Sequence, residues 1–94
     1  MVEYKLDGAY LKDRHGHRIG QLDGKYIRDA HGARVGELDG QYVRDAHGRK
    51  LAQVDGAHVR DASGRRIVTV DDIRKVIDGA GGASLVALWI LLLQ

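Results

Sequence analysis

A sixteen-residue repeat dominates residues 1–70 and limits the folds open to this chain. Its first motif is an aliphatic residue followed by Asp-Gly, found at Leu6-Asp7-Gly8, Leu22-Asp23-Gly24, Leu38-Asp39-Gly40 and Val54-Asp55-Gly56. Its second motif is found at Asp13-Arg14-His15-Gly16, Asp29-Ala30-His31-Gly32, Asp45-Ala46-His47-Gly48 and Asp61-Ala62-Ser63-Gly64. Asp-Gly between extended residues is a strong signal for a two-residue type I′ hairpin, and the second motif fits a type I turn that ends in a left-handed glycine. The chain is therefore expected to reverse about every eight residues.

These turns predict a mainly β fold with a C-terminal α segment. The predicted architecture is an antiparallel β-meander of about nine short strands, built from 16-residue hairpin repeats and covered by short C-terminal helices. The strands are expected near residues 3–6, 9–12, 17–22, 25–28, 33–38, 41–44, 49–54, 57–60 and 65–70. Residues 1–70 would form the sheet, and residues 71–94 a helical segment that packs on the sheet or on a partner subunit, within a single domain overall. A parallel solenoid is the alternative, but Asp-Gly is typical of hairpins.

The lengths of the two turns set the register of the strands. The short turn places Leu38 opposite Gln41, and the long turn, taken as a four-residue loop, places Val43 opposite Lys50. A three-residue loop would move equivalent residues to opposite faces in successive repeats, because a one-residue slip inverts a strand. The four-residue loop is preferred since the repeats should be equivalent.

In this register neither face of the sheet is plainly polar. One face carries Leu11, Ile27, Val43 and Val59, then Gly20, Gly36, Ala52 and Val68, then Leu22, Leu38, Val54 and Val70. The other face carries Tyr10, Tyr26, Tyr42 and His58 beside Ile19, Val35, Leu51 and Ile67. Both faces need cover, since a one-sided sheet should alternate between apolar and polar residues. Either a second copy covers the tyrosine face, or the sheet curls strongly and leaves that face in water with arginine stems over the tyrosines.

The sequence after the repeats predicts two short helices. Asp71 or Asp72 would cap an amphipathic helix that ends at Gly79, and Ser84 would cap an apolar helix over residues 85–93. A helix that is apolar all round must be buried in protein or in lipid. The stretch has roughly half of the ~20 apolar residues that a bilayer span needs, which favours a core or inter-subunit helix over a membrane-associated tail. The candidate core or oligomer residues are Leu85, Leu88, Trp89 and Leu92.

The composition and motifs weigh against several classes of chemistry. The chain has no cysteine, which excludes disulfides and thiolate metal sites. The opening segment is charged and has no apolar run, which indicates no signal peptide, so a cytoplasmic location is expected. Asp13, His15 and His17 form one incomplete group of metal-ligand types, and turn geometry explains the repeated Asp and His better than a metal site does. Known nucleophile, phosphate-loop and zinc-protease motifs are missing, so neither enzyme activity nor a cofactor is expected.

Rows of tyrosine and arginine form the candidate interaction surface, namely Tyr10, Tyr26, Tyr42, Arg28, Arg44 and Arg60. Aromatic rings beside arginines on a sheet are able to stack single-stranded bases and neutralise phosphates. The net charge of only +2, from 15 basic and 13 acidic residues, argues against a dedicated nucleic-acid binder. A contact face for a second copy or for another protein is therefore preferred, with single-stranded nucleic acid as the alternative.

The repeat reads approximately R-I-G-x-L-D-G-x-Y-V-R-D-A-H-G and is followed by I-R-K-V-I-D-G-A-G-G-A and an apolar end. This pattern resembles small uncharacterised bacterial β-hairpin repeat proteins, some of which occur among integron gene-cassette products. The resemblance covers nearly the whole chain and implies a repeat fold without a particular activity. The sequence thus predicts a non-enzymatic structural or interaction module that self-associates as a homo-oligomer through its apolar sheet face and C-terminal helix. Membrane association through the C-terminal tail is a further alternative.

Overall fold

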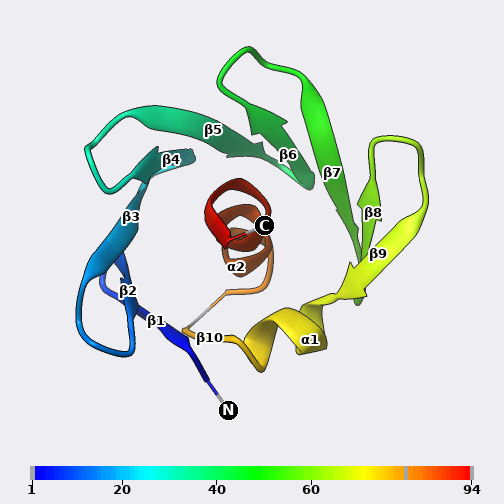
Figure 1. Cartoon of the computed structure of the whole chain (residues 1–94). Helices are drawn as coiled ribbons and strands as arrows, with labels where there is room; N and C mark the ends of the chain where they lie inside the picture. Colours follow the sequence, from blue (N-terminus) through cyan, green and yellow to red (C-terminus); the bar gives the residue numbers. More distant parts are fainter. Residues whose placement is uncertain (1, 80, 94) are drawn as a thin grey trace.

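The computed structural model describes residues 2–79 and 81–93, in which nine strands from the repeats and one from the C-terminal segment form a ten-stranded sheet (Figure 1). Strands β1 to β9 follow one another in space and pair antiparallel, which confirms the predicted meander. They are β1 Tyr4–Asp7, β2 Tyr10–Asp13, β3 Arg18–Asp23, β4 Tyr26–Asp29, β5 Arg34–Asp39, β6 Tyr42–Asp45, β7 Lys50–Asp55, β8 His58–Asp61 and β9 Arg66–Thr69. Each strand begins one residue later than the sequence predicted, because the loops are placed differently around their glycines.

Each short turn is a two-residue loop that starts at its glycine. In the third repeat Gly40 has a φ of 62°, whereas Gln41 has no positive φ. This is the pattern of a type II′ turn rather than the predicted type I′ turn. Leu38 therefore pairs with Val43, and the predicted pairing of Leu38 with Gln41 is wrong. The loop still holds two residues, so each side chain keeps its predicted face.

Each long turn holds three residues and is followed by a β-bulge. The amide of Asp45 donates to the carbonyl of Arg49 at 2.9 Å, which closes a three-residue loop between them. The ladder then shifts by one residue, so that Val43 pairs with Ala52. The predicted four-residue loop with Val43 opposite Lys50 is therefore wrong. A three-residue loop inverts the faces and the bulge inverts them again, so equivalent residues of all repeats share one side.

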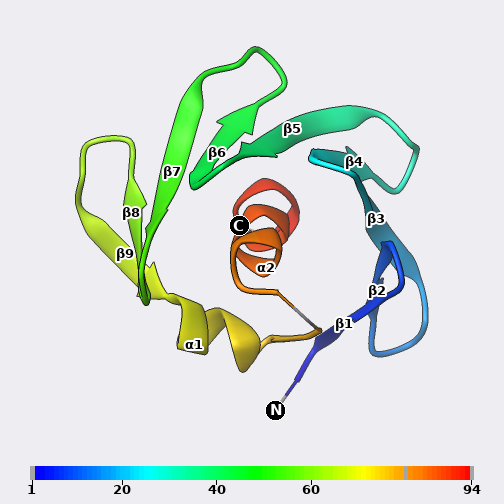
Figure 2. The ribbon, with the colours of Figure 1, turned by 180° about the vertical axis from the view of Figure 1, so that it is seen from behind.

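The sheet curls around the C-terminal helix, and its long-turned hairpins spread outward (Figures 1 and 2). After β9, the short helix α1 (Val70–Arg74) leads to strand β10 (Ile77–Asp78), which pairs in parallel with β1. The amide of Tyr4 also donates to the carbonyl of Val76 at 2.9 Å. Four long-turned hairpins and α1 thus surround helix α2 (Ala83–Leu88), and the sheet is strongly curled, as one of the two predicted arrangements requires.

Helix α1 begins at Val70, the position that in the earlier repeats precedes the next long-turned hairpin. The amide of Val70 still donates to the carbonyl of Ala57 at 2.9 Å, as the equivalent residues of the earlier repeats do. Thr69 and Asp72 then form a capping box, in which each side chain bonds the backbone of the other residue. The predicted N-cap at Asp71 or Asp72 is wrong, because Thr69 supplies the capping hydroxyl and Asp72 takes the third helical position.

The other predicted helix boundaries are shifted as well. Helix α1 ends at Arg74 rather than at Gly79, because the chain extends after it to pair with β1. The predicted cap of the second helix at Ser84 is also wrong, since α2 has Gly82 at its N-cap without a side-chain hydrogen bond.

The core lies between the inner face of the sheet and α2 with its π-helical continuation η1 (Trp89–Leu93). Fully buried side chains come from both sides: Leu11, Ile27, Val43, Val59, Ile77, Leu85, Val86, Ala87 and Leu88. Gly20 and Gly36 let the helix approach the sheet closely, because a Cβ on Gly36 would lie 2.6 Å from Leu91 Cδ1. The same row continues with Ala52 in the next repeat, so the helix lies nearest to β3 and β5.

Candidate interaction surface

A cation from the next strand lies over the ring of each outer tyrosine. The guanidinium carbon of Arg18 lies 4.0 Å from the ring centre of Tyr10, and that of Arg34 lies 4.6 Å from the ring centre of Tyr26. Lys50 Nζ lies 4.7 Å from the ring centre of Tyr42. These three residues occupy equivalent places in their repeats, on the far strand of the long turn. Their cations hold the tyrosines against the sheet and attract the negative faces of the rings.

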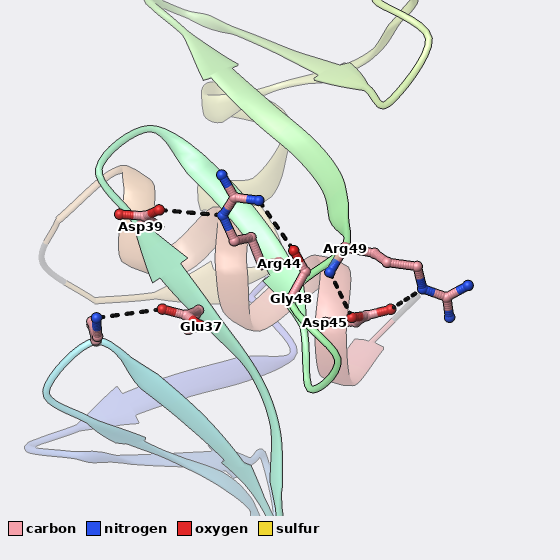
Figure 3. A network of polar contacts seen from close by, with 7 residues as sticks. Glu37, Asp39, Arg44, Asp45, Gly48 and Arg49 are labelled. Carbon is pink, nitrogen blue, oxygen red and sulfur yellow. Dashed lines mark hydrogen bonds and ion pairs between the residues drawn. The ribbon is translucent and has the colours of Figure 1, made fainter.

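Each of the arginines named on the candidate surface links the two turns of its strand, and the guanidinium carbon of Arg44 also lies 5.8 Å from the ring centre of Tyr42. Arg44 Nε donates to Asp39 Oδ2 at 3.2 Å, and Arg44 Nη1 donates to the carbonyl of Gly48 at 3.1 Å (Figure 3). Equivalent contacts occur at Arg28 with Asp23 and Gly32, and at Arg60 with Asp55 and Gly64. The candidate arginines therefore support the hairpins from which they come.

The aspartate that opens each long turn organises the backbone of that turn. Asp45 Oδ1 accepts from the amide of His47 at 2.8 Å. It also accepts from the amide of Arg49 at 3.0 Å, and Arg49 Nε donates to Asp45 Oδ2 (Figure 3). Desolvation raises the pKa of the Asp45 carboxyl, but the amides of Arg49 and His47 and the guanidinium of Arg49 together outweigh it and hold the pKa below its ordinary value. The hydroxyl of Ser63 and the amide of Arg65 lower the pKa of Asp61 in the same way.

The candidate residues of the C-terminal helix lie away from the tyrosine face. Leu85 and Leu88 are fully buried inside the curled sheet, whereas Trp89 and Leu92 are half-buried toward the end of the helix. The structure therefore separates the two predicted groups, with the tyrosines and arginines outside and the leucines inside. It brings together the members of each group but does not join them into one site.

An apolar hollow opens between the last two long-turned hairpins and the central helix. It measures about 360 Å³ and is lined by Leu51, Asp61, Ile67 and Ile90. Leu51 and Ile67 are 36% and 38% exposed, which makes them the most exposed large aliphatic residues of strands β1 to β9. The prediction that Leu51 and Ile67 lie beside the tyrosines is therefore wrong. It is also wrong for Ile19 and Val35, which pack against the core. The reason is the same for all four residues, since each one stands at a β-bulge. The sequence does not predict this hollow, because the predicted register assumes strands without bulges, in which side chains alternate strictly between the two faces.

A second, polar hollow lies between the first two long-turned hairpins. It measures about 260 Å³ and is lined by Tyr10, Arg18, Gly20, Gln21, Asp29, Ala30, His31 and Gly32. Sequence reasoning found Tyr10 but missed Arg18, Gln21 and His31 as neighbours. For Gln21 the repeat did contain a signal, because the equivalent residue of the next unit is Glu37 and the two units therefore differ in charge at this position.

A metal site requires several ligand side chains close together, and a membrane-spanning helix requires a long apolar stretch. Within residues 2–79 and 81–93, no three His, Cys, Asp or Glu side chains are grouped so as to hold a metal ion. His17 Nδ1 lies 3.3 Å from Asp13 Oδ2, and the ring centres of His15 and His17 are 6.2 Å apart. No helix in the same ranges combines the length and the apolar character needed to cross a bilayer.

The hairpins and the central helix define a small β-repeat protein whose units radiate around an axis. The family model described as 5-fold beta-flower protein matches residues 2–81, and the chain belongs to this family. The four long-turned hairpins and α1 account for five units around the helix. Comparison with curated proteins and with solved structures gave no match.

Proposed function

We propose that the protein is a non-enzymatic interaction module that self-associates through the apolar hollow at Leu51, Ile67 and Ile90. The exposure of Leu51 and Ile67 beside the partly buried Ile90 is the observation that carries the proposal. Apolar residues that cluster at the surface of a small protein are typical of contact sites. A contact between identical patches related by a two-fold axis would fill both hollows and close the assembly as a dimer.

The rest of the apolar surface is already used within the chain, which limits where a second copy binds. The inner sheet face and the buried residues of α2, such as Leu85 and Leu88, form the core and offer no contact area. Of the interface that the sequence predicts, the apolar sheet face and the C-terminal helix, only the residues that line the hollow remain for the proposed contact with a second copy. Burying a large aliphatic side chain completely contributes about 1.5–3 kcal/mol, so this patch supports a moderate affinity.

Light scattering with size-exclusion chromatography tests this proposal. The native protein should elute as a species larger than its 10.3 kDa chain, and the Leu51→Ser/Ile67→Ser variant should elute as a monomer with an unchanged fold by circular dichroism. Val2→Ser is the matched control, because Val2 is an exposed aliphatic residue that does not line the hollow. A monomeric native protein at high concentration, or an equal effect of Val2→Ser, would contradict the proposal.

Binding of single-stranded nucleic acid at the tyrosine face is a second proposal. The observation in its favour is the row of cations over Tyr10, Tyr26 and Tyr42. The ion pairs of Arg28 and Arg44 weigh against it, since their aspartate partners repel phosphates. The test is a titration with a labelled single strand at low and high salt, in which binding should weaken with salt and in the Arg34→Ala/Lys50→Ala variant, which lacks two of the cations over the rings.

A cytoplasmic location and an origin among bacterial gene-cassette products also belong to what we propose. The resemblance of the repeat to such products supports the proposed origin, and the lack of cysteine in the sequence fits the reducing cytoplasm. Flotation with lipid vesicles tests the remaining alternative of a membrane-associated tail, and recovery of the chain with the vesicles would favour that tail over the hollow as the contact site.

A further inference from the structure

We propose that the polar hollow at Tyr10, Arg18, Gln21 and His31 binds a small ligand that bears a phosphate or carboxylate group. The hollow has room for a compact metabolite of a few carbon atoms, at about 260 Å³. The acid group would contact the guanidinium of Arg18, with the Gln21 amide and the His31 imidazole as further donors. This site is independent of the proposed self-association, which uses the opposite hairpins.

Arg18 is placed to receive an anion because its guanidinium lies over an aromatic ring rather than beside an acid group. Among the described residues, no carboxylate lies within ion-pair distance of Arg18, whereas Arg28, Arg44 and Arg60 each contact an aspartate. Arg18 stacks on Tyr10 with 4.0 Å between its guanidinium carbon and the ring centre. A stacked guanidinium keeps its N–H groups at the edge, where they are able to bond both oxygens of an acid group. The ring also restrains the side chain, which lowers the entropy lost on binding.

The next repeat supplies an internal comparison, because it differs at one important position. Arg34 and Tyr26 repeat the stacked pair, but Glu37 replaces Gln21 and its carboxylate lies 3.5 Å from Lys25 Nζ. A carboxylate at this position repels an anion, whereas a glutamine amide donates to it. The first unit is therefore expected to bind an acid group and the second is not.

The third unit lacks two of the donors. It restores the amide with Gln53, but Lys50 replaces the arginine and Ser63 replaces the histidine. An ammonium offers a point charge without the bidentate geometry of a guanidinium. Binding there should be weaker than in the first unit.

Asp29 also lines the hollow and refines the class of ligand. Its Oδ1 accepts from the amides of His31 at 2.9 Å and Ala33 at 3.0 Å, so that part of its charge is compensated by the turn. Its other oxygen is able to accept from a hydroxyl of the ligand. The favoured ligand is thus an acid with a neighbouring hydroxyl, such as a short polyol phosphate.

A titration followed by ¹H–¹⁵N NMR tests the site, with inorganic phosphate and glycerol 3-phosphate as probes and glycerol as the neutral control. At constant ionic strength, both phosphates should give saturable shifts at the Arg18 Nε–H, the Gln21 side-chain amide and the His31 amide. A dissociation constant on the order of 1 mM or below is expected for a few charge-assisted hydrogen bonds at an open site. Glycerol should cause no such shifts.

Variants in equivalent repeats provide matched controls. Arg18→Gln and Gln21→Glu should each weaken binding at least tenfold, while Arg34→Gln should leave it unchanged. Glu37→Gln should add a second binding site in the second unit. Shifts that do not saturate, or equal weakening by Arg18→Gln and Arg34→Gln, would show only general attraction to surface charge and would overturn the proposal. Failure of Glu37→Gln to add a site would overturn the role given to Gln21.

Discussion

Two kinds of residue hold the hairpins in shape, the aspartates of the turns and, in the first two long-turned hairpins, the glycines beneath the helix. The aspartates compensate backbone amides that the loops leave unpaired, as Asp45 does for His47 and Arg49. The glycines act by their small size, since the helix and the neighbouring strand leave no room for a Cβ at Gly36. Local hydrogen bonding and close packing thus impose different demands at positions a few residues apart.

The turn aspartates predict a loss of stability in acid. The folded-state pKa values of Asp13, Asp45 and Asp61 lie below the ordinary 3.8, so their contribution is present above about pH 4 and is lost as the pH falls through the folded values. Urea denaturation at several pH values should show the free energy of unfolding falling below pH 4. The triple Asp→Asn variant retains the acceptor oxygens without the titration, and its stability should depend less on pH in this range. An unchanged acid dependence in that variant would contradict the prediction.

Gly36→Ala is expected to destabilise the fold by about 1–3 kcal/mol, the usual cost of overpacking a core. The added Cβ would lie 2.6 Å from Leu91 Cδ1 and would also collide with the carbonyl of Arg44. Gly82→Ala is the control, because a Cβ there meets its nearest neighbours, Arg74 and Val70, at 3.6 Å. Thermal denaturation should show a lower Tm for the first variant and little change for the second.

At the scale of elements, the sequence predicts the strands well and their pairing less well. Asp-Gly and Asp-x-x-Gly place the reversals because the demand for a left-handed glycine is local. Register was missed because the same glycine at Gly40 serves a type I′ turn or a type II′ turn, and the two differ by one residue in where the loop begins. The bulges were missed because Leu51 and its equivalents are aliphatic and fit a regular alternation of faces.

The sequence predicted the candidate site only in part, because the repeat spacing identifies rows of residues but the register decides which rows are neighbours. Tyr10, Tyr26 and Tyr42 were found because they recur at the repeat spacing on an outer row. Their partners Arg18, Arg34 and Lys50 come from across the long turn and its bulge, so an incorrect register hid them. The use of Arg44 as a link between turns depends on side-chain geometry that a repeat pattern does not contain.

The start of α1 leads to a prediction about a single cap. Thr69→Ala removes the hydroxyl that accepts from the amide of Asp72 at 3.1 Å. The expected loss is about 1 kcal/mol, the typical value of an N-cap. Chemical denaturation measures it, with Thr69→Ser as the control that keeps the hydroxyl. Equal stabilities of the alanine and serine variants would contradict the role of the cap.

At the scale of the whole molecule, the central helix is the common support of all the hairpins. Leu85, Val86, Ala87 and Leu88 are fully buried within the curled sheet, although the family match ends at residue 81. Each hairpin alone buries too little apolar surface to be stable in water. The sheet therefore depends on the residues that follow its last strand.

Leu88→Ala tests this dependence and is expected to cost about 2–5 kcal/mol, a large part of the stability of a small domain. Leu93→Ala, near the partly exposed end of the helix, should cost clearly less. A chain that ends at Gly82 should fail to fold, and a peptide of residues 83–94 should restore its circular dichroism spectrum. A folded truncated chain would contradict the prediction.

The parallel pairing of β10 with β1 has a consequence for how such proteins change in size. Because the last strand pairs with the first, the hairpins and α1 form a closed ring around the helix. The size of this ring is limited by the space that the side chains of one helix are able to fill. A linear array of repeats gains or loses units at its ends with little effect on the others. Here an inserted or deleted hairpin would leave a void or a collision at the axis, so the number of units is expected to vary only together with the bulk of the helix at the centre.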